Sequence, residues 1–226
     1  MITAKRFTRA KQRLSGSMDP DLRRQLVEAM LGDVLEAVSE SRMVSGTVVV
    51  TGEDAAIELA EQFGAGVVHD PDDISHSEAA LLGVGRAEQM GAECVTLLPG
   101  DCPLLDPREL DRLVTGLPNP YVAVVPDRHG TGTNALALVP PRAIRPAFGE
   151  GSCARHLDLA SQAAIPHSLD ELFTLGLDID TPADIVALTS AIDNAGGETI
   201  NCGAGDDLSN MNLKDLDNDC ESFLFP

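Results

Sequence analysis

Short aliphatic segments alternate with longer segments of helical periodicity along most of the chain, and this alternation constrains the fold more than any other feature. Strands are predicted as a short stub near the start and then at 46–52, 66–69, 93–101, 121–127, 133–139 and 175–180. Helices are predicted from Pro20 to Val38, at 54–63, 78–90, 107–116 and 141–147, and after Ser152 and Thr181. Such alternation is typical of a mostly parallel, doubly wound α/β sheet covered on both faces, which makes a three-layer domain.

Composition limits the core and divides the chain. Hydrophobic residues make up 43% of the 226 residues, but aromatic residues make up only 3% and tryptophan is absent, so the core must be aliphatic. One large domain is expected over residues 1–192. Residues 193–226 hold eight acidic residues against one lysine and show no clear apolar period. We therefore expect an acidic, largely disordered tail there.

The net charge of −20, with only three lysines, makes nucleic acid and anionic membranes poor partners. No apolar run approaches the length of a membrane span, and residues 1–13 lack the apolar block of a signal peptide. The five cysteines include no CxxC pair. A reduced, cytoplasmic protein without a zinc site is expected.

Acidic residues stand at the ends of two predicted strands. Asp101 closes the buried segment ECVTLLPGD, and Asp178 and Asp180 stand two residues apart in LGLDIDTPAD. Side chains at i and i+2 of a strand point to the same face, so two unpaired carboxylates there would repel each other. Ligands of open α/β sheets bind beyond the carboxyl ends of the strands, and Mg²⁺ prefers oxygen ligands. The three aspartates therefore predict a site for one or two Mg²⁺ ions carrying a polyphosphate, although Asp101 alone could merely cap a turn.

Three further segments could bind anions. The loop DRHGTGTNAL (127–136) offers hydroxyls and free amides, and FGEGSCARH (148–156) is predicted to open a helix with Ser152 as its N-cap. The segment AKRFTRAKQRL (4–14) concentrates five basic residues in a very acidic protein, and Lys5, Lys11 and Arg13 are our candidates for binding a nucleoside triphosphate. Each segment also has a simpler interpretation: a hairpin loop, an ordinary helix cap and a solvated charge run.

Together these segments resemble, in content and order, the CofC/FbiD family of phosphoenolpyruvate and 2-phospho-L-lactate guanylyltransferases of coenzyme F-420 biosynthesis. The resemblance rests on AKRFTRAKQRL, PGDCPLL, PDRHGTGTNAL, FGEGSCARH and LDIDTPAD and runs through residues 1–192. It implies a nucleotide-diphospho-sugar-transferase-like fold of the GT-A type. It also implies that Asp101, Asp178 and Asp180 hold Mg²⁺, and that Thr133, Gly149 and Ser152 bind the phosphorylated acid.

Enzymes of that family join a phosphorylated three-carbon acid to GMP from GTP and release diphosphate. A phosphate oxygen is already ionised at neutral pH, so this reaction needs no general base, and no histidine or cysteine stands out as one. This chain departs from many members in having Ser77-Glu78 where they carry Leu-Asn. The departure affects the contacts that are expected to face the nucleotide base.

Several alternatives stay open at this level. The acceptor could instead be 3-phosphoglycerate, a molybdopterin or a sugar phosphate, although the Gly-rich G-x-G-x-R loop of the latter enzymes is absent after the first strand. A non-catalytic nucleotide-binding module is the alternative from another class. The choice between phosphoenolpyruvate and 2-phospho-L-lactate, the identity of the base and the formation of a homodimer are also open.

Overall fold

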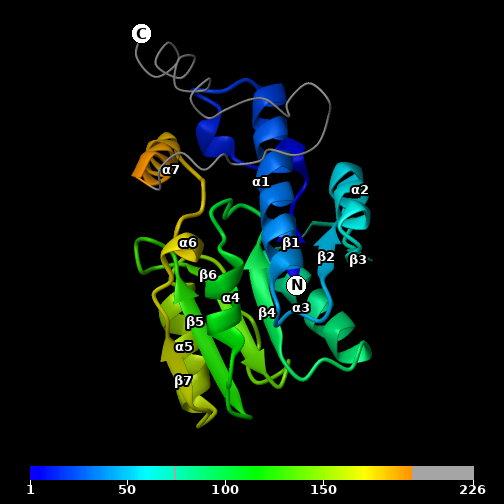
Figure 1. The fold of residues 1–226 in the computed structure, drawn as a ribbon, viewed down its shortest axis with the longest axis vertical. Coiled ribbons are helices and arrows are strands. Elements are labelled where there is room, and N and C mark those ends of the chain that lie inside the picture. The colour runs from blue at the N-terminus through cyan, green and yellow to red at the C-terminus, as the bar shows by residue number, and fades with distance from the viewer. Residues whose placement is uncertain (74, 195–226) are drawn as a thin grey trace.

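The computed structural model describes residues 1–73 and 75–194, and the strands within these ranges form one mixed sheet (Figure 1). The spatial order is β3-β2-β1-β4-β6-β5-β7. The strands are β1 (Ile2–Ala4), β2 (Val48–Thr51), β3 (Gly66–His69), β4 (Val95–Pro99), β5 (Tyr121–Pro126), β6 (Thr133–Val139) and β7 (His167–Leu169).

Helices cover both faces of this sheet, as the alternating pattern predicts. They are α1 (Pro20–Glu40), α2 (Asp54–Gln62), α3 (His76–Gln89), α4 (Pro107–Val114), α5 (Ser152–Gln162), α6 (Phe173–Gly176) and α7 (Pro182–Asn194). Apolar residues of α1, α2, α4 and α7 pack on one face of the sheet, and those of α3 and α5 pack on the other. The three-layer α/β prediction is confirmed.

Strand direction decides which residues meet at one edge. β1 pairs in parallel with β2 and β4, β2 with β3, and β5 with β7, whereas β6 runs antiparallel to both β4 and β5. The first residues of β6 therefore lie at the same edge as the last residues of the other strands. This places Thr133 beside the residues that follow β1 and β4, at the edge where ligands of such sheets bind.

The predicted strand at 175–180 is wrong. Residues 173–176 form α6, and 177–180 run extended without pairing in the sheet; the backbone N–H of Ile179 instead donates to the Asp101 carbonyl (3.2 Å). Leu177 and Ile179 are nevertheless buried while Asp178 and Asp180 are half-buried. Because extended backbone alternates its side chains whether or not it pairs, the two aspartates still share a face.

Two other predictions fail for local reasons. Residues 141–147 form turns and loop rather than a helix, in a segment that contains Pro140, Pro141 and Pro146; proline removes N–H donors and restricts the residue before it. β7 was not predicted, because His-Ser-Leu is too short and too polar to show a strand pattern. The predicted tail lies outside the described residues beyond Asn194.

The helix that opens at Asp19-Pro20 forms as predicted. The Asp19 carboxylate accepts from the backbone N–H groups of Asp21 and Leu22, both at 2.9 Å, which satisfies two donors left free at a helix start. The core is aliphatic, with Phe7 as its only aromatic side chain among the fully buried residues described. No helix in the described ranges has both the length and the apolar character needed to cross a bilayer.

Candidate active site

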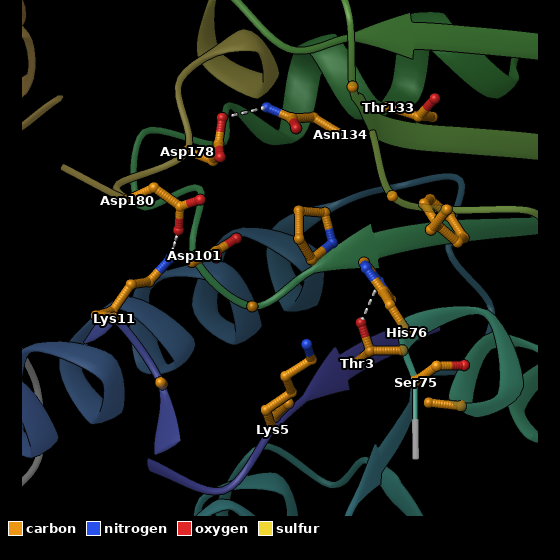
Figure 2. A pocket seen from close by; sticks show the side chains of 18 of the residues that line it. Thr3, Lys5, Lys11, Ser75, His76, Asp101, Thr133, Asn134, Asp178 and Asp180 are labelled. Carbon is orange, nitrogen blue, oxygen red and sulfur yellow. Dashed lines mark hydrogen bonds and ion pairs between the residues drawn. The ribbon is translucent and has the colours of Figure 1, made fainter. Parts of the chain in front are cut away.

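A cavity of about 720 Å³ opens at the edge of the sheet where β1 and β4 end and β6 begins (Figure 2). It is large enough for a nucleotide and a small acid. Its lining includes every residue that the sequence marked as a candidate: Lys5, Lys11, Arg13, Asp101, Thr133, Gly149, Ser152, Asp178 and Asp180. Residues from five separate segments are thus brought to one space, and the roles assigned to them remain predictions.

The first wall of the cavity, here called the acidic wall, consists of Asp101, Asp178 and Asp180. Asp101 directly follows the turn at the end of β4, and its carbonyl accepts the backbone N–H of Ile179 (3.2 Å). That bond places the 177–180 segment beside the β4 turn. It explains how residues almost eighty positions apart come to face the same space.

Lys11 lies between two of these carboxylates. Its Nζ donates to Asp101 Oδ2 at 2.5 Å and to Asp180 Oδ1 at 2.8 Å, and its side chain is only 5% exposed. Burial alone would lower the pKa of Lys11, but the Asp101 and Asp180 carboxylates outweigh it and raise the pKa above its ordinary value. Among the described residues, no three carboxylate, imidazole or thiol groups converge as a metal-binding cluster. In the acidic wall, this ammonium group stands between Asp101 and Asp180.

The third carboxylate has a neutral partner. Asn134 Nδ2 donates to Asp178 Oδ1 (3.1 Å) and to the Leu175 carbonyl (2.8 Å). Burial raises the pKa of Asp178, and the neighbouring Asp101 charge raises it further. The sequence interpretation assigned no role to Asn134, although it is a strongly polar side chain in a strand that is buried throughout. A buried amide in such a strand requires partners, and that was the available signal.

The second wall, here called the neutral wall, consists of Thr133, Gly149 and Ser152, which line the cavity, and of His156, which bonds to Thr133 from outside the lining. Thr133 is 7% exposed, and Ser152 and His156 are almost fully buried. Ser152 was predicted as the helix N-cap, and this is wrong. Gly151 is the N-cap, with φ +69°, and Ser152 is the first residue of α5. Glycine adopts this left-handed conformation without steric cost, so the chain enters the helix there.

His156 bonds through both ring nitrogens. Its Nδ1 lies 3.0 Å from Thr133 Oγ1, and its Nε2 accepts the backbone N–H of Ala147 at 2.9 Å. Burial, aided by Arg155 and His76, lowers the pKa of His156 to about 4. Phe148 packs edge-on against this ring, with centroids 5.1 Å apart, and stacks on His76 at 4.3 Å. The sequence interpretation noted His156 only as part of a helix opening.

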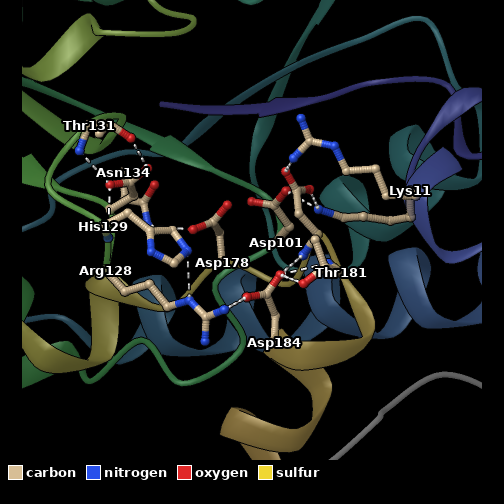
Figure 3. A network of polar contacts seen from close by, with 12 residues as sticks. Lys11, Asp101, Arg128, His129, Thr131, Asn134, Asp178, Thr181 and Asp184 are labelled. Atoms are coloured by element: carbon tan, nitrogen blue, oxygen red, sulfur yellow. Dashed lines mark hydrogen bonds and ion pairs between the residues drawn. The ribbon is translucent and has the colours of Figure 1, made fainter. Parts of the chain in front are cut away.

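The loop between β5 and β6, which precedes Thr133, reaches the acidic wall through Arg128 and Asp184 (Figure 3). Its Asp127 carboxylate accepts the backbone N–H groups of His129 (3.1 Å) and Thr131 (2.9 Å). A Cβ on Gly132 would lie 2.7 Å from that carboxylate, so a larger residue there would displace the Asp127 side chain. Arg128 then pairs with Asp184.

Asp184 in turn organises the acidic wall. It is 4% exposed, and its Oδ2 accepts the backbone N–H groups of Asp180 (3.0 Å) and Thr181 (2.6 Å) and the Thr181 hydroxyl (2.8 Å). These bonds cap α7 and fix the backbone that carries Asp180. Through Arg128, the position of the acidic wall is linked to the loop that precedes Thr133.

The remaining basic residues lie around the opening. Arg13 pairs with Asp180 at 3.6 Å, and Lys5 and Arg9 line the cavity. Figure 2 shows Lys5 apart from the Lys11 cluster. Arg6, by contrast, donates to the Pro71 carbonyl (3.2 Å) and lies outside the lining. The basic segment therefore divides into residues that face the cavity and one that does not.

Known structures share this architecture. A protein from Desulfovibrio desulfuricans described as a nucleotide-diphospho-sugar transferase matches with a TM-score of 0.73 at 14% identity, over 98% of this chain and 96% of that one. A cytidylyltransferase from Leptospira borgpetersenii matches with a TM-score of 0.56 at 18% identity, over 98% and 94%. These likenesses show the fold, an α/β architecture that the described part of the chain shares with both transferases.

Sequence comparison narrows the class. The chain belongs to the family described as guanylyl transferase CofC like, whose model matches residues 1–195. A phosphoenolpyruvate guanylyltransferase of Conexibacter woesei is 42% identical over 195 residues, which cover 85% of this chain and 87% of the relative. Another, of Sphaerobacter thermophilus, is 40% identical over 190 residues, 83% of this chain and 90% of the relative.

Proposed function

We propose that this protein joins a phosphorylated three-carbon acid, phosphoenolpyruvate or 2-phospho-L-lactate, to GMP from GTP and releases diphosphate, as a step of coenzyme F-420 biosynthesis. The observation that carries the proposal is 42% identity to a phosphoenolpyruvate guanylyltransferase over almost the whole described domain. That relative's name favours phosphoenolpyruvate as the acid. The cavity supports the proposal because it combines an acidic wall with a neutral wall rich in hydrogen-bond donors.

The acidic wall fits Mg²⁺. Asp101, Asp178 and Asp180 supply carboxylate oxygens, the ligands that Mg²⁺ prefers. The close approach of Lys11 to two of them indicates that this wall requires a cation to offset its charge. Bound there, Mg²⁺ would neutralise phosphate oxygens and the charge that develops on the departing diphosphate. Lys11 would then be free to pair with the triphosphate of GTP, together with Lys5 and Arg13.

The neutral wall suits the acid. Thr133 and Ser152 offer hydroxyls, and Ser152 brings the start of α5 to the cavity, where the positive end of a helix dipole favours an anion. The backbone N–H groups of Ser152 and Cys153 donate to the carbonyls of Gly149 and Thr131. A phosphate oxygen of the acid, ionised at neutral pH, forms the new bond to the α-phosphorus of GTP, and the bond from that phosphorus to the bridging oxygen of diphosphate breaks. The walls hold the two anions together in orientation, which supplies much of the rate.

The test is a direct assay of diphosphate release with GTP and Mg²⁺. Phosphoenolpyruvate, 2-phospho-L-lactate and 3-phosphoglycerate are compared as acceptors, and ATP, CTP and UTP replace GTP in parallel. The expected result is release with GTP and phosphoenolpyruvate or 2-phospho-L-lactate, with the joined product identified by mass. Preference for 3-phosphoglycerate would reassign the acceptor, and no release with any acid would refute the proposal.

A further inference from the structure

His156 is a fully buried histidine beside the cavity. A buried imidazole requires hydrogen-bond partners, and the identity of those partners determines which nitrogen carries the proton. Here both partners are known, one a backbone N–H and one a hydroxyl. The second of these is the hydroxyl of Thr133, which faces the cavity.

The partner of Nε2 fixes the tautomer. The backbone N–H of Ala147 can only donate, so Nε2 must present its lone pair, and the proton of the neutral ring lies on Nδ1. A protonated ring would carry an N–H at Nε2 as well, and this donor would face the N–H donor of Ala147. The low pKa of His156 agrees with a ring that stays neutral at physiological pH.

The tautomer in turn orients a hydroxyl of the site. Nδ1–H donates to Thr133 Oγ1 over 3.0 Å, which occupies a lone pair of that oxygen. The hydroxyl proton of Thr133 cannot point back at Nδ1–H and must seek an acceptor elsewhere. Thr133 opens onto the cavity, so the acceptor it can serve is an oxygen of a bound ligand.

We propose that His156 is a positioning residue that holds the Thr133 hydroxyl as a committed hydrogen-bond donor toward an anionic oxygen of the phosphorylated acid. This inference rests on the proposed function, since it assigns the acid to the neutral wall. It accounts for a neutral histidine at a site that handles two anions. The imidazole contributes direction to a neighbouring hydroxyl, and Phe148 packs against the ring and maintains its orientation.

Two substitutions separate this role from a structural one. Asn at position 156 can place an amide N–H near the Nδ1 position and keep the donation to Thr133, but it loses the contact with Ala147. Gln extends to the Nε2 position and can accept from Ala147, but it loses the donation. His156→Gln is expected to raise the KM for phosphoenolpyruvate at least about tenfold, the value of one hydrogen bond to a charged group. His156→Asn is expected to raise it less than about threefold. The KM for GTP should not change in either variant.

A double-mutant cycle with Thr133→Val completes the experiment. If His156 acts through the Thr133 hydroxyl, His156→Gln adds no further increase in KM when that hydroxyl is already absent. Additive effects, or a greater loss in His156→Asn than in His156→Gln, would overturn the inference, because a merely structural histidine depends on the Ala147 contact. Thermal midpoints of all variants report the structural contribution separately. If the wild-type protein uses 2-phospho-L-lactate rather than phosphoenolpyruvate, the cycle is measured with that acid. Failure of the wild type to use any of the acids refutes the proposed function instead.

Discussion

The two walls of the cavity present opposite solutions to the binding of anions. The acidic wall carries three carboxylates, and one buried ammonium group holds two of them, so its geometry depends on a counter-ion. The neutral wall carries hydroxyls and an uncharged imidazole that satisfy one another through hydrogen bonds. Charge balance governs the first wall and hydrogen-bond direction governs the second. Substitutions in the two walls should therefore differ in size, in metal dependence and in pH dependence.

The largest effect is expected at the acidic wall. Asp101→Asn keeps the shape of the side chain but removes a charged oxygen ligand, and it should lower kcat/KM by at least about 10³-fold, roughly 4 kcal/mol of transition-state stabilisation. The thermal midpoint should fall little, because the variant also removes repulsion with Asp178. Steady-state kinetics in Mg²⁺ is the measurement. Activity within about tenfold of wild type would contradict the assignment of Asp101 as a metal ligand.

Sequence reasoning identified this wall for a specific physical reason. Carboxylates are conspicuous at the ends of aliphatic segments, and alternation along extended backbone placed Asp178 and Asp180 on one face even though their strand does not exist. The partners of Lys11, Asn134 and Asp184 lie tens of residues away, and no local pattern carries that information. The sequence therefore predicted that the three aspartates share one edge of the sheet, and most of the order of the elements. The role of these aspartates as metal ligands stays a prediction.

The neutral wall was harder to predict. The acid-binding roles of Thr133, Gly149 and Ser152 entered only through the family resemblance, although their segments were already candidates for binding anions. The N-cap was misplaced by one residue because the left-handed backbone of Gly151 was not considered. His156 shares the buried face of α5 with Cys153 and Ala160, at helical spacings of three and four. That spacing predicts burial. The hydrogen bond between His156 and Thr133, by contrast, forms only when α5 packs beside β6.

The second prediction concerns the counter-ion. Lys11→Met leaves Asp101 and Asp180 without a cation, so the protein without Mg²⁺ should lose roughly 2 kcal/mol of stability, less than a fully buried pair because Asp180 is 44% exposed. Mg²⁺ should restore more of the thermal midpoint in this variant than in wild type, since no ammonium group competes for the carboxylates. Thermal denaturation across a Mg²⁺ titration measures both effects. Weaker Mg²⁺ stabilisation in Lys11→Met would contradict the fit of Mg²⁺ to this wall.

The third prediction uses pH to separate the walls. The pKa of His156 is about 4 in the fold against an ordinary 6.5, so the unfolded chain binds more protons between these values and the stability due to His156 falls as the pH drops from 6.5 toward 4. Between these pKa values, the slope of the free energy of unfolding against pH approaches about 1.4 kcal/mol per pH unit. The stability advantage of wild type over His156→Asn, measured by chemical denaturation, should shrink over this window.

The acidic wall should respond in the opposite direction. Burial, then the Asp101 charge, raises the pKa of Asp178, so the fold binds its proton more readily than the unfolded chain does. The contribution of Asp178 to the stability of the fold is complete below the ordinary pKa of a carboxyl group. It is lost as the pH rises through the raised pKa. Relative to Asp178→Asn, wild type should thus lose stability as the pH increases. Parallel pH dependences for the two comparisons would show that the walls do not differ in this way.

The smallest effect is expected where the walls join. Arg128, on the loop before Thr133, pairs with Asp184, which holds the backbone of Asp180. Arg128→Met should raise the KM values for GTP and for the acid together, by about threefold each, because a pair that is partly open to solvent contributes less than about 1 kcal/mol. Arg142→Met removes a similar charge from an exposed pair with Glu88 outside the cavity and serves as the matched control, in which neither KM should move. If Arg128→Met changes only one of the two constants, the pair belongs to one wall, and the link between the walls must run through other contacts.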